Sequence, residues 1–578
     1  MKRIIFILMG LLVLAAAALA TNAGGIRSAA TAAVPTEQRN QIIALTSRWN
    51  ARKVDTADLV PMRCTGMNPV GVNTFLEQEP DVAKRRQSLQ MIKDAGIGWI
   101  RQQFPWEDIE IPSKGKFWDE KFNQSTWDKY DNIVNLANEY GIQVIARLDL
   151  PPRWAHPGNE WSATPPDNFD DYGDFVYSVV SRYKGKVRFY QLWNEPNLSI
   201  EWGGKPVDAK EYVRLLQAGY RRAKEADPNA VVISAALAPT IEESWRALSD
   251  LKYLQQMYDA GAKDSFDIMS VMAYGLRSGP DDRRLDFGDV NFSRPIRTRE
   301  IMVRNGDAAK PIWASEMGWN TQPESVTAAP TFGRVSEALQ ASYTVRAFQR
   351  AAEEWPWMGV MSVWFFKRAD DHESDQPFYY FRMVDPDFTP RPVYGAIKAL
   401  ATKPPNLRVG YSPADNRAVA YTGNWQQGSL AGTSTVRFST AGGATVGFYF
   451  KGSDLTLLAP RGKELGLAHV VIDGQSVMAN RLLRDASGKA AVDLRSDQPV
   501  AEEQIPLATG LPNEPHRVEI QAAGPFAVDG FIVQSREPDL AWWLFGTLAI
   551  VAVPLAVGGV LLVAARRRKR PSPAVNAS

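Results

Sequence analysis

Short apolar runs alternate with longer amphipathic stretches between about residues 70 and 400. Compact apolar runs bounded by turn residues are typical of buried strands, and apolar positions that recur with helical spacing are typical of helices. The expected strands are Gly71–Leu76, Trp99–Phe104, Gln143–Leu150, Val187–Leu192, Ala230–Ala236, Phe266–Met272, Pro311–Ala314 and Gly359–Phe366. The expected helices are Asp81–Asp94, Trp127–Tyr140, Tyr172–Tyr183, Val207–Ala226, Trp245–Ala260, Arg294–Asn305, Val335–Glu354 and Pro392–Ala401. Repeated strand–helix pairs predict an α/β fold, a (β/α)8 TIM barrel with insertions.

The pattern changes after about residue 404. Short alternating runs are separated by Gly, Ser and Asn, and no helical period appears. The expected strands are Thr435–Ser439, Thr445–Phe450, Leu455–Leu458, His469–Ile472, Val518–Ile520 and Val528–Val533. This pattern predicts an all-β sandwich over residues 404–536.

The C-terminal part predicts a transmembrane helix. Ala541–Ala565 contains no charged residue, and as a helix it is about 37 Å long, enough to cross the ~30 Å core of a bilayer. Trp542 and Trp543 fit one membrane interface, and the basic run Arg566–Arg570 predicts a cytoplasmic tail on the other side. We therefore expect the body of the chain to face the outside of the cell.

The N-terminal segment fits two interpretations. Lys2 and Arg3 precede an uncharged run over 4–20, and Ala18-Leu19-Ala20 resembles a cleavage site. A cleaved secretory signal is favoured over an uncleaved anchor. The expected divisions are a signal or anchor at 1–23, a linker at 24–62, the barrel at 63–403, the sandwich at 404–536, the membrane span at 541–565 and the tail at 566–578.

Composition narrows the classes of function. Lys and Arg total 66 against 64 Asp and Glu, so no global charge suggests a nucleic-acid partner. Cys64 is the single cysteine, which excludes an intrachain disulfide, and the four histidines have no metal-ligand spacing. We expect neither metal nor cofactor. The 18 Trp are compatible both with large cores and with stacking on sugar rings.

Two glutamates occupy matching places in the expected barrel. Glu195 follows the fourth strand in Trp193-Asn194-Glu195-Pro196-Asn197, and Glu316 follows the seventh strand, 121 residues later. Active sites of such barrels lie at the carboxyl ends of the strands. A pair of carboxyl groups is what glycoside hydrolysis needs, because one protonates the leaving oxygen and the other attacks or activates water.

The stretch from Tyr190 to Asn197 resembles the acid/base strand of retaining clan A glycoside hydrolases, most of all family 39 and related exopolysaccharide endoglycosidases. Asp149–Ala155, Ser181–Lys186, Ala226–Ala230 and Val384–Pro392 resemble further segments of these enzymes. The resemblance covers about residues 70 to 400. It implies that Glu195 is the general acid/base, that Glu316 is the nucleophile, and that their carboxyl groups lie about 5 to 5.5 Å apart.

Further site residues are expected around this pair. Arg101 is a candidate cation that keeps Glu316 ionised, Asn194 a candidate ligand of the sugar 2-hydroxyl, and Tyr274 a candidate donor to Glu316. Several clan members carry a histidine where this chain has Met272. The aromatic candidates for sugar contacts, for each of which core packing is an equal alternative, are Trp106, Trp154, Trp319 and Trp364.

Two other segments suggest carbohydrate contacts. Gly279–Asp286 is a charged insertion in which Arg283 and Arg284 would select an acidic sugar, although a solvated loop is the simpler interpretation. The sandwich resembles galactose-binding-like jelly-roll modules over Val446–Asp454, Ala468–Gly474 and Val528–Val533. Such a module either binds glycan or only holds the barrel away from the membrane.

The sequence therefore predicts a membrane-anchored, exterior-facing retaining glycosidase. Its expected partners are a polysaccharide or exported glycan as substrate and the lipid bilayer around Ala541–Ala565, with no nucleic acid. Two alternatives stay open: a transglycosylase on the same glycan, and a non-catalytic glycan-binding surface protein. The sugar, the linkage and endo versus exo action do not follow from the sequence.

Overall fold

The computed structural model describes residues 36–49, 53–430, 436–476, 483–484 and 488–535. The expected signal or anchor at 1–23, the membrane span at 541–565 and the basic tail at 566–578 lie outside these residues. Among the helices within the described ranges, none combines the length and the apolar character that a bilayer crossing requires.

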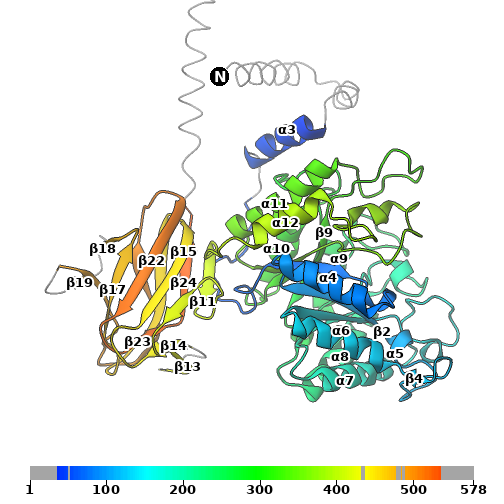
Figure 1. Ribbon diagram of the computed structural model, residues 1–578, viewed down its shortest axis with the longest axis horizontal. Coiled ribbons are helices and arrows are strands. Elements are labelled where there is room, and N and C mark those ends of the chain that lie inside the picture. The colour runs from blue at the N-terminus through cyan, green and yellow to red at the C-terminus, as the bar shows by residue number, and fades with distance from the viewer. Residues whose placement is uncertain (1–35, 50–52, 431–435, 477–482, 485–487, 536–578) are drawn as a thin grey trace, which may run out of the picture.

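Parallel strands form the barrel of the N-terminal part (Figure 1). They are β1 (Val70–Thr74), β2 (Trp99–Pro105), β5 (Gln143–Asp149), β6 (Phe189–Leu192), β7 (Val231–Ile233), β8 (Met269–Tyr274), β9 (Ile312–Gly318) and β10 (Met358–Val363). Their order is β7-β6-β5-β2-β1-β10-β9-β8, and parallel bridges from Ile233 to Ile268 and from Leu237 to Val271 join the two ends. The predicted TIM barrel is therefore confirmed.

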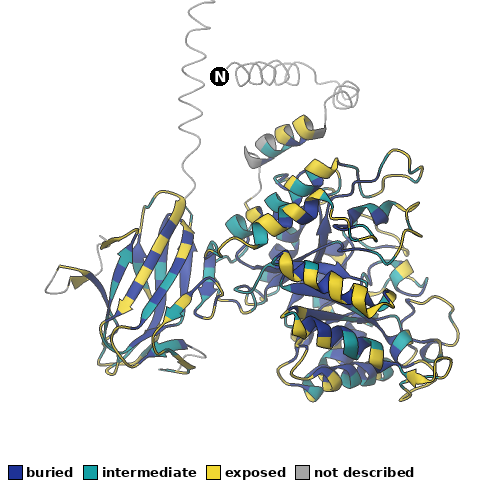
Figure 2. Ribbon diagram, in the orientation of Figure 1, coloured by how far each residue is buried: buried dark blue, intermediate teal, exposed yellow. Residues whose placement is uncertain are grey.

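Amphipathic helices surround the sheet and bury one face each, as Figure 2 shows. They are α4 (Val82–Asp94), α6 (Trp127–Glu139), α7 (Phe169–Tyr183), α8 (Ala209–Ala226), α9 (Asp250–Asp259), α10 (Arg294–Arg304), α11 (Glu337–Glu354) and α12 (Pro392–Ala401), with α3 (Thr36–Trp49) before them. The start of α8 illustrates why they begin where they do, because the Asp208 carboxylate accepts a hydrogen bond from the Lys210 amide. Buried Tyr212, Leu215 and Leu216 then form the apolar stripe of that helix.

Short elements fill the connections between barrel strands and helices. They are η1 (Leu76–Gln78), α5 (Trp106–Ile109), the hairpin β3 (Trp118–Asp119) and β4 (Gln124–Ser125), η2 (Arg153–Ala155), η3 (Ser199–Glu201), η4 (Ala262–Ser265) and η5 (Pro377–Phe381). All but η4 lie in connections that run from the carboxyl end of a strand to the next helix, so they build the rim where the expected site lies.

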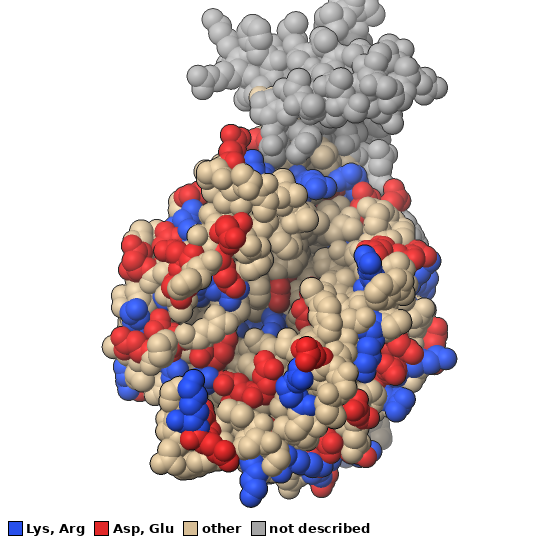
Figure 3. Space-filling model, turned by 90° about the vertical axis from the view of Figure 1, so that its right-hand side faces the viewer, with Lys and Arg blue, Asp and Glu red and all other residues tan. Residues whose placement is uncertain are grey.

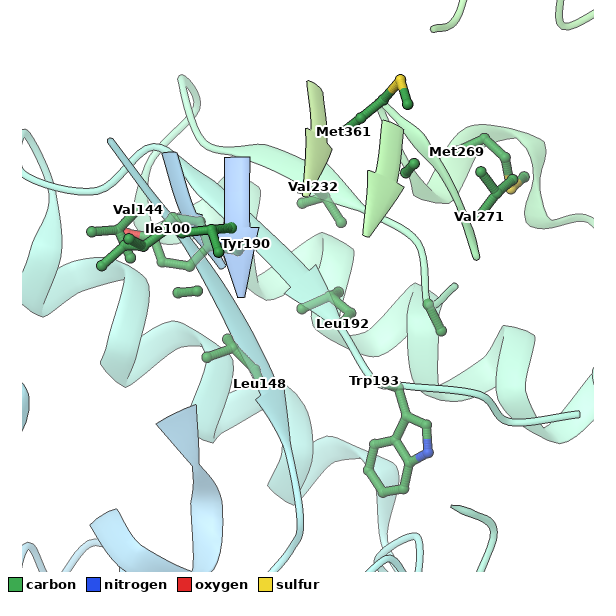
Figure 4. Close-up of a cluster of buried hydrophobic side chains, with 14 of the residues drawn as sticks. Ile100, Val144, Leu148, Tyr190, Leu192, Trp193, Val232, Met269, Val271 and Met361 are labelled. Carbon is green, nitrogen blue, oxygen red and sulfur yellow. The ribbon is translucent and has the colours of Figure 1, made fainter. Parts of the chain in front are cut away.

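Side chains on the two faces of the strands have different surroundings. Outward residues such as Ile100, Val144 and Leu192 pack under the helices (Figure 4). Inside the barrel, an aromatic layer closes the amino-terminal end: the rings of Trp99 and Trp313 meet edge to face at 5.2 Å, and Phe189 stacks on Trp313 at 5.0 Å. The polar layer above it carries the site described below.

Antiparallel sheets form the C-terminal part, and Figure 1 places them beside the barrel. One sheet has the order β11-β24-β16-β21, a second β12-β15-β22-β17-β20-β19, with β18 paired to β17, and a third β13-β14-β23. The strands are β11 (Gly410–Pro413), β12 (Ala420–Thr422), β13 (Gln426–Gly428), β14 (Val436–Ser439), β15 (Thr445–Gly452), β16 (Asp454–Arg461), β17 (Leu467–Ile472), β18 (Gln475–Ser476), β19 (Leu483–Arg484), β20 (Ala490–Asp493), β21 (Val500–Ala508), β22 (Glu514–Ala522), β23 (Phe526–Val528) and β24 (Gly530–Gln534). Alternate buried and exposed residues in β15 and β22 give these strands one face in a shared core and one in solvent (Figure 2).

The expected elements agree with the structure in type and differ at some ends. Strand β9 continues to Gly318, so Glu316 lies within the strand and not after it. Strand β7 is only three residues long, and α9 begins at Asp250, because the chain between them runs as an extended rim loop. The six strands expected in the sandwich did not include β11, β12, β13 or β18–β21, which are short or, in β21, irregular in their burial. The domain limits and the jelly-roll resemblance stay predictions.

Gly359 tests the packing of the aromatic layer. A Cβ at this β10 position would lie 2.1 Å from the indole nitrogen of Trp313, which donates a hydrogen bond to the Cys64 carbonyl. We expect Gly359→Ala to lower the free energy of unfolding by about 1–3 kcal/mol in urea titrations, because the indole must move. Gly395→Ala in α12 is the control: its Cβ meets nothing within 4 Å, so it should be neutral or stabilising. Equal effects of the two variants would contradict this packing.

Candidate active site

A strained loop after β6 presents Glu195. Trp193 and Glu195 both have positive φ values, 77° and 41°, which side-chain-bearing residues adopt only when their surroundings impose them. Two neighbouring strand ends hold the loop, since the Trp193 amide donates to the Leu148 carbonyl and the Glu195 amide to Ala236. Asn197, fully buried, adds hydrogen bonds to Ala238 and Leu248. The hydrogen bonds of the segment Trp193–Asn197 thus fix the backbone that carries Glu195.

A bulge in β9 turns Glu316 into the barrel. The register of β9 shifts against β8 and β10 near Ser315. The side chains of both Ser315 and Glu316 therefore reach the interior, although neighbours in a regular strand point to opposite faces. The Glu316 carboxylate accepts one hydrogen bond from Arg101 at 2.8 Å and one from the Tyr274 hydroxyl at 2.5 Å.

Arg101 joins four strands through one guanidinium group. Besides Glu316 it donates to Gln191 at 2.6 Å, to Asn73 at 2.9 Å and to Asn194 at 2.9 Å. Its side chain is 2% exposed, so these contacts replace its hydration. The structure thus brings four of the expected site residues, Arg101, Asn194, Tyr274 and Glu316, into one network. Arg101 contacts Glu316, as expected, but its burial leaves it no direct contact with a sugar.

The electrostatic surroundings distinguish the two glutamates. Burial raises the pKa of Glu195 well above its usual range, and the negative charge of Glu316 raises it further. Glu316 itself has Arg101 and Tyr274 as donors. Burial and the Glu316 charge also raise the pKa of Tyr274, which keeps this phenol protonated as a donor. The site thus contains an acid that retains its proton beside a carboxylate that is ion-paired.

Glu201 is a third carboxyl group at this site that the sequence reasoning missed. It ends η3, six residues after Glu195, and hydrogen-bonds with Asn194. Burial raises its pKa to about 7 against the opposing charge of Arg147. Arg147 itself pairs with Asp149 at 2.7 Å. The spacing from Glu195 gave no signal, because η3 is a short turn whose direction the sequence pattern does not set.

The aromatic candidates for sugar contacts differ in how far they are buried. Trp364 is half-buried after β10, and its ring meets Phe75 edge to face at 5.6 Å. Trp154 is half-buried over Trp106, with its indole nitrogen donating to the Glu110 carbonyl. Both retain surface for a ligand. The proposed sugar contacts of Trp319 and Trp106 are wrong, because both side chains are 0% exposed.

Exposed aromatic residues at the rim were also missed. Trp161, in the loop after β5, and Trp245, in the loop after β7, are 51% and 54% exposed, and Trp118 and Phe122 lie in the β3–β4 hairpin. Figure 3 views the molecule from the side opposite the sandwich and shows this face hollowed, with acidic and basic groups at the floor. A rim with exposed rings around a polar floor is suited to sugars.

The two arginines of the charged insertion after β8 form ion pairs within the protein. Arg283 forms ion pairs with Glu354 of α11 and with Asp281, and Arg284 pairs with Asp282 at 2.6 Å and with Asp289 at 3.4 Å. Because both arginines are already paired within the protein, the structure favours the solvated-loop interpretation over the selection of an acidic sugar. Within the described ranges, no group of three or more His, Cys, Asp or Glu side chains is arranged to hold a metal ion.

Part of the barrel matches a known family. Residues 60–260, which include Glu195 but not Glu316, match the family described as cellulase (glycosyl hydrolase family 5). Among curated proteins, the chain is 28% identical over 122 residues to a beta-xylosidase of Caldicellulosiruptor saccharolyticus, covering 19% of this chain and 24% of that protein. It is 24% identical over 205 residues to endo-1,4-beta-xylanase C of Paenibacillus barcinonensis, covering 31% and 17%.

Similar solved structures include a family 39 glycoside hydrolase from Bacteroides cellulosilyticus WH2, with 19% identity, a TM-score of 0.45, and coverage of 81% of this chain and 82% of the other. A monomeric beta-xylosidase from Caulobacter crescentus CB15 has 14% identity, a TM-score of 0.42, and coverage of 81% and 98%. The chain spans about a quarter or less of the length of the curated relatives described above. The resemblance to glycoside hydrolases is confirmed, and it rests on part of the barrel, residues 60–260.

Removing the Glu316 charge should lower the pKa of Glu195. In Glu316→Gln the Coulombic contribution is lost while burial remains, so the pKa should fall toward, but not reach, its usual value. A pH titration of the carboxylic C=O stretch by difference infrared spectroscopy, referenced to Glu195→Gln, measures this without any turnover. An unchanged or increased pKa would show that the two carboxyl groups do not interact.

Proposed function

We propose that this protein is a retaining glycoside hydrolase in which Glu195 is the general acid/base and Glu316 the nucleophile. The observation that carries the proposal is the unequal pair: Glu316 is ion-paired to Arg101, while burial and the Glu316 charge hold the proton on Glu195. A glycosidase that acts near neutral pH needs one protonated and one ionised carboxyl group.

In the first step, the Glu316 oxygen attacks the anomeric carbon and the glycosidic C–O bond breaks. Glu195 transfers its proton to the leaving oxygen. The negative charge of Glu316 then passes into a covalent ester, so the Coulombic effect that raised the Glu195 pKa disappears. Glu195, now ionised, accepts a proton from water as the water oxygen displaces Glu316 and releases the sugar with its original configuration.

The neighbouring polar groups support these steps. Arg101 and Tyr274 hold both Glu316 oxygens, which leaves the carboxylate one orientation for attack. Asn194 lies between Arg101 and Glu201 and is the candidate partner for the sugar 2-hydroxyl. Trp364 beside Phe75 supplies an apolar surface for the sugar whose bond is broken.

The substrate that this rim supports is a polymer or long oligosaccharide. Exposed rings at Trp118, Trp161 and Trp245 lie on three different βα connections, so they spread along the rim and offer stacking positions away from the glutamates. The names of the similar beta-xylosidase and xylanase concern those proteins, and the present sugar and linkage are left to experiment.

We also propose that Ala541–Ala565 anchors the protein in the cell membrane, with the barrel outside and the basic tail in the cytoplasm. The support is the uncharged length of the segment and the five cations that follow it. Glycan substrates of polymeric size are outside the membrane, which agrees with this orientation.

Hydrolysis of a panel of extracellular polysaccharides and β-linked oligosaccharides tests the activity. Glu195→Gln should lower kcat/KM roughly 10²–10⁴-fold on substrates with poor leaving groups, and Glu316→Gln should lose about 10⁴-fold or more. Glu464→Gln, exposed in the turn between β16 and β17 of the sandwich, is the matched control and should retain activity. The proposal fails if the wild type cleaves no glycan or if Glu316→Gln is as active as Glu464→Gln.

Membrane anchoring is tested by truncation after Ser535. The full chain should sediment with membranes and resist carbonate extraction, whereas the truncated chain should be released in soluble form with its activity intact. Release of the full chain by carbonate would show that the segment does not span the bilayer.

A further inference from the structure

A pocket of about 720 Å³ lies between the barrel and the sandwich. Its walls are the loop before β1 (65–70), the end of α11, the linker after α12 (403–409), the turn after β11 (416–418) and Lys451 of β15. The pocket adjoins the amino-terminal end of the strands, since Asn68 and Pro69 directly precede β1. It is therefore separate from the glutamates at the other end of the barrel.

Cations outnumber carboxylates in this pocket. Two of the lining carboxylates, those of Glu353 and Glu354, form ion pairs. Glu353 pairs with Arg346 at 2.8 Å and with Lys451 at 3.3 Å. Glu354 pairs with Arg283 and with Arg350 of α11. Asp58 is the remaining lining carboxyl group, and burial raises its pKa against the opposing charge of Arg299. Glu353 and Glu354 are thus matched by cations, and burial disfavours a negative charge on Asp58.

Three lining cations remain: Lys403, which is exposed, and the neighbouring pair Arg408 and Arg417. Within the described residues, Arg408 makes one hydrogen bond, to the Met358 carbonyl at 3.1 Å, and neither arginine forms an ion pair. Burial and the neighbouring Arg417 charge lower the pKa of Arg408 to about 10. Two guanidinium groups that repel each other without a carboxylate between them favour an anion.

The other lining residues suit a molecule that carries polar groups in addition to the anion. Five amide side chains line the pocket, those of Asn68, Asn406, Asn416, Asn513 and Gln349, of which Asn68 is already hydrogen-bonded to the backbone of Gly96 and Val70. Amides donate to and accept from hydroxyl groups, and the volume is within the range of small-molecule sites and far larger than a bare inorganic anion needs. A hydroxylated molecule with a carboxylate combines both requirements.

We propose that this pocket binds an acidic sugar unit of a glycan, with the carboxylate held by Arg408 and Arg417 and the hydroxyl groups by the surrounding amides. That the anion is a sugar rests on the proposed glycosidase function; that an anion binds rests on the pocket alone. Because the pocket is remote from Glu195 and Glu316, it holds a part of the glycan that is not being cleaved and raises the local substrate concentration.

Calorimetric titration of the detergent-solubilised full chain tests the assignment. The protein carries Glu316→Gln so that no probe is cleaved, and the probes are an oligosaccharide of D-glucuronic acid and its carboxyl-reduced neutral form. We expect the acidic oligosaccharide to bind at least tenfold more tightly, with binding that weakens as salt rises. Arg417→Gln, at an exposed position that the fold tolerates, should weaken binding of the acidic form at least tenfold; Arg408→Gln should do the same if it folds.

Arg495→Gln is the matched control. Arg495 is an exposed arginine of the sandwich outside the pocket, paired with Asp493, and its substitution should leave binding unchanged. The proposal is overturned if the two oligosaccharides bind equally, if Arg417→Gln binds as Arg495→Gln does, or if inorganic phosphate binds through Arg417 while neither oligosaccharide does. None of these readouts requires catalysis, so failure of this site and failure of the proposed hydrolysis are separate results.

Discussion

The buried guanidinium of Arg101 is the constraint on which the rest of the site depends. It links β2 to β1, β6 and β9 through Asn73, Gln191 and Glu316, and it reaches the loop after β6 through Asn194. A guanidinium group that is 2% exposed is stable only when its N–H groups donate hydrogen bonds. Each partner is therefore held in place by its hydrogen bond to Arg101. These hydrogen bonds form a polar layer next to the apolar layer of Trp99, Phe189 and Trp313.

Charge balance inside the barrel explains why its carboxyl groups behave differently. Two cations, Arg101 and Arg147, face four carboxyl groups. Glu316 and Asp149 hold these cations directly, at 2.8 and 2.7 Å. Ionisation of Glu195 or Glu201 would add negative charge without a new counterion, and burial makes this costly, so the pKa of Glu195 lies well above its usual range and that of Glu201 at about 7.

Much of this architecture could be predicted from the sequence, since the strand–helix alternation is strong. The barrel follows from apolar runs whose period is unambiguous, and Asn194 and Glu195 stand out because they follow such a run. What could not be predicted depends on backbone irregularity and on side-chain burial. The bulge at Ser315 brings two adjacent side chains into the barrel, whereas the alternating pattern of a regular strand predicts that they point to opposite faces. Trp319 lies flat against Gly275, so a residue beside the nucleophile is core, and Glu201 enters the site because η3 turns back over Asn194.

The central claim is that Glu316 forms a covalent bond to the sugar, while Glu195 first donates a proton and then accepts one. Mass spectrometry of Glu195→Gln, mixed with an activated glycoside of the sugar it cleaves and quenched in acid, tests this most directly. An activated leaving group needs no protonation, whereas hydrolysis of the ester does need a base, so the intermediate should accumulate. The account predicts one glycosyl unit attached to the peptide that contains Glu316. A glycosyl unit on another residue, or released sugar of inverted configuration with no attached unit, would contradict it.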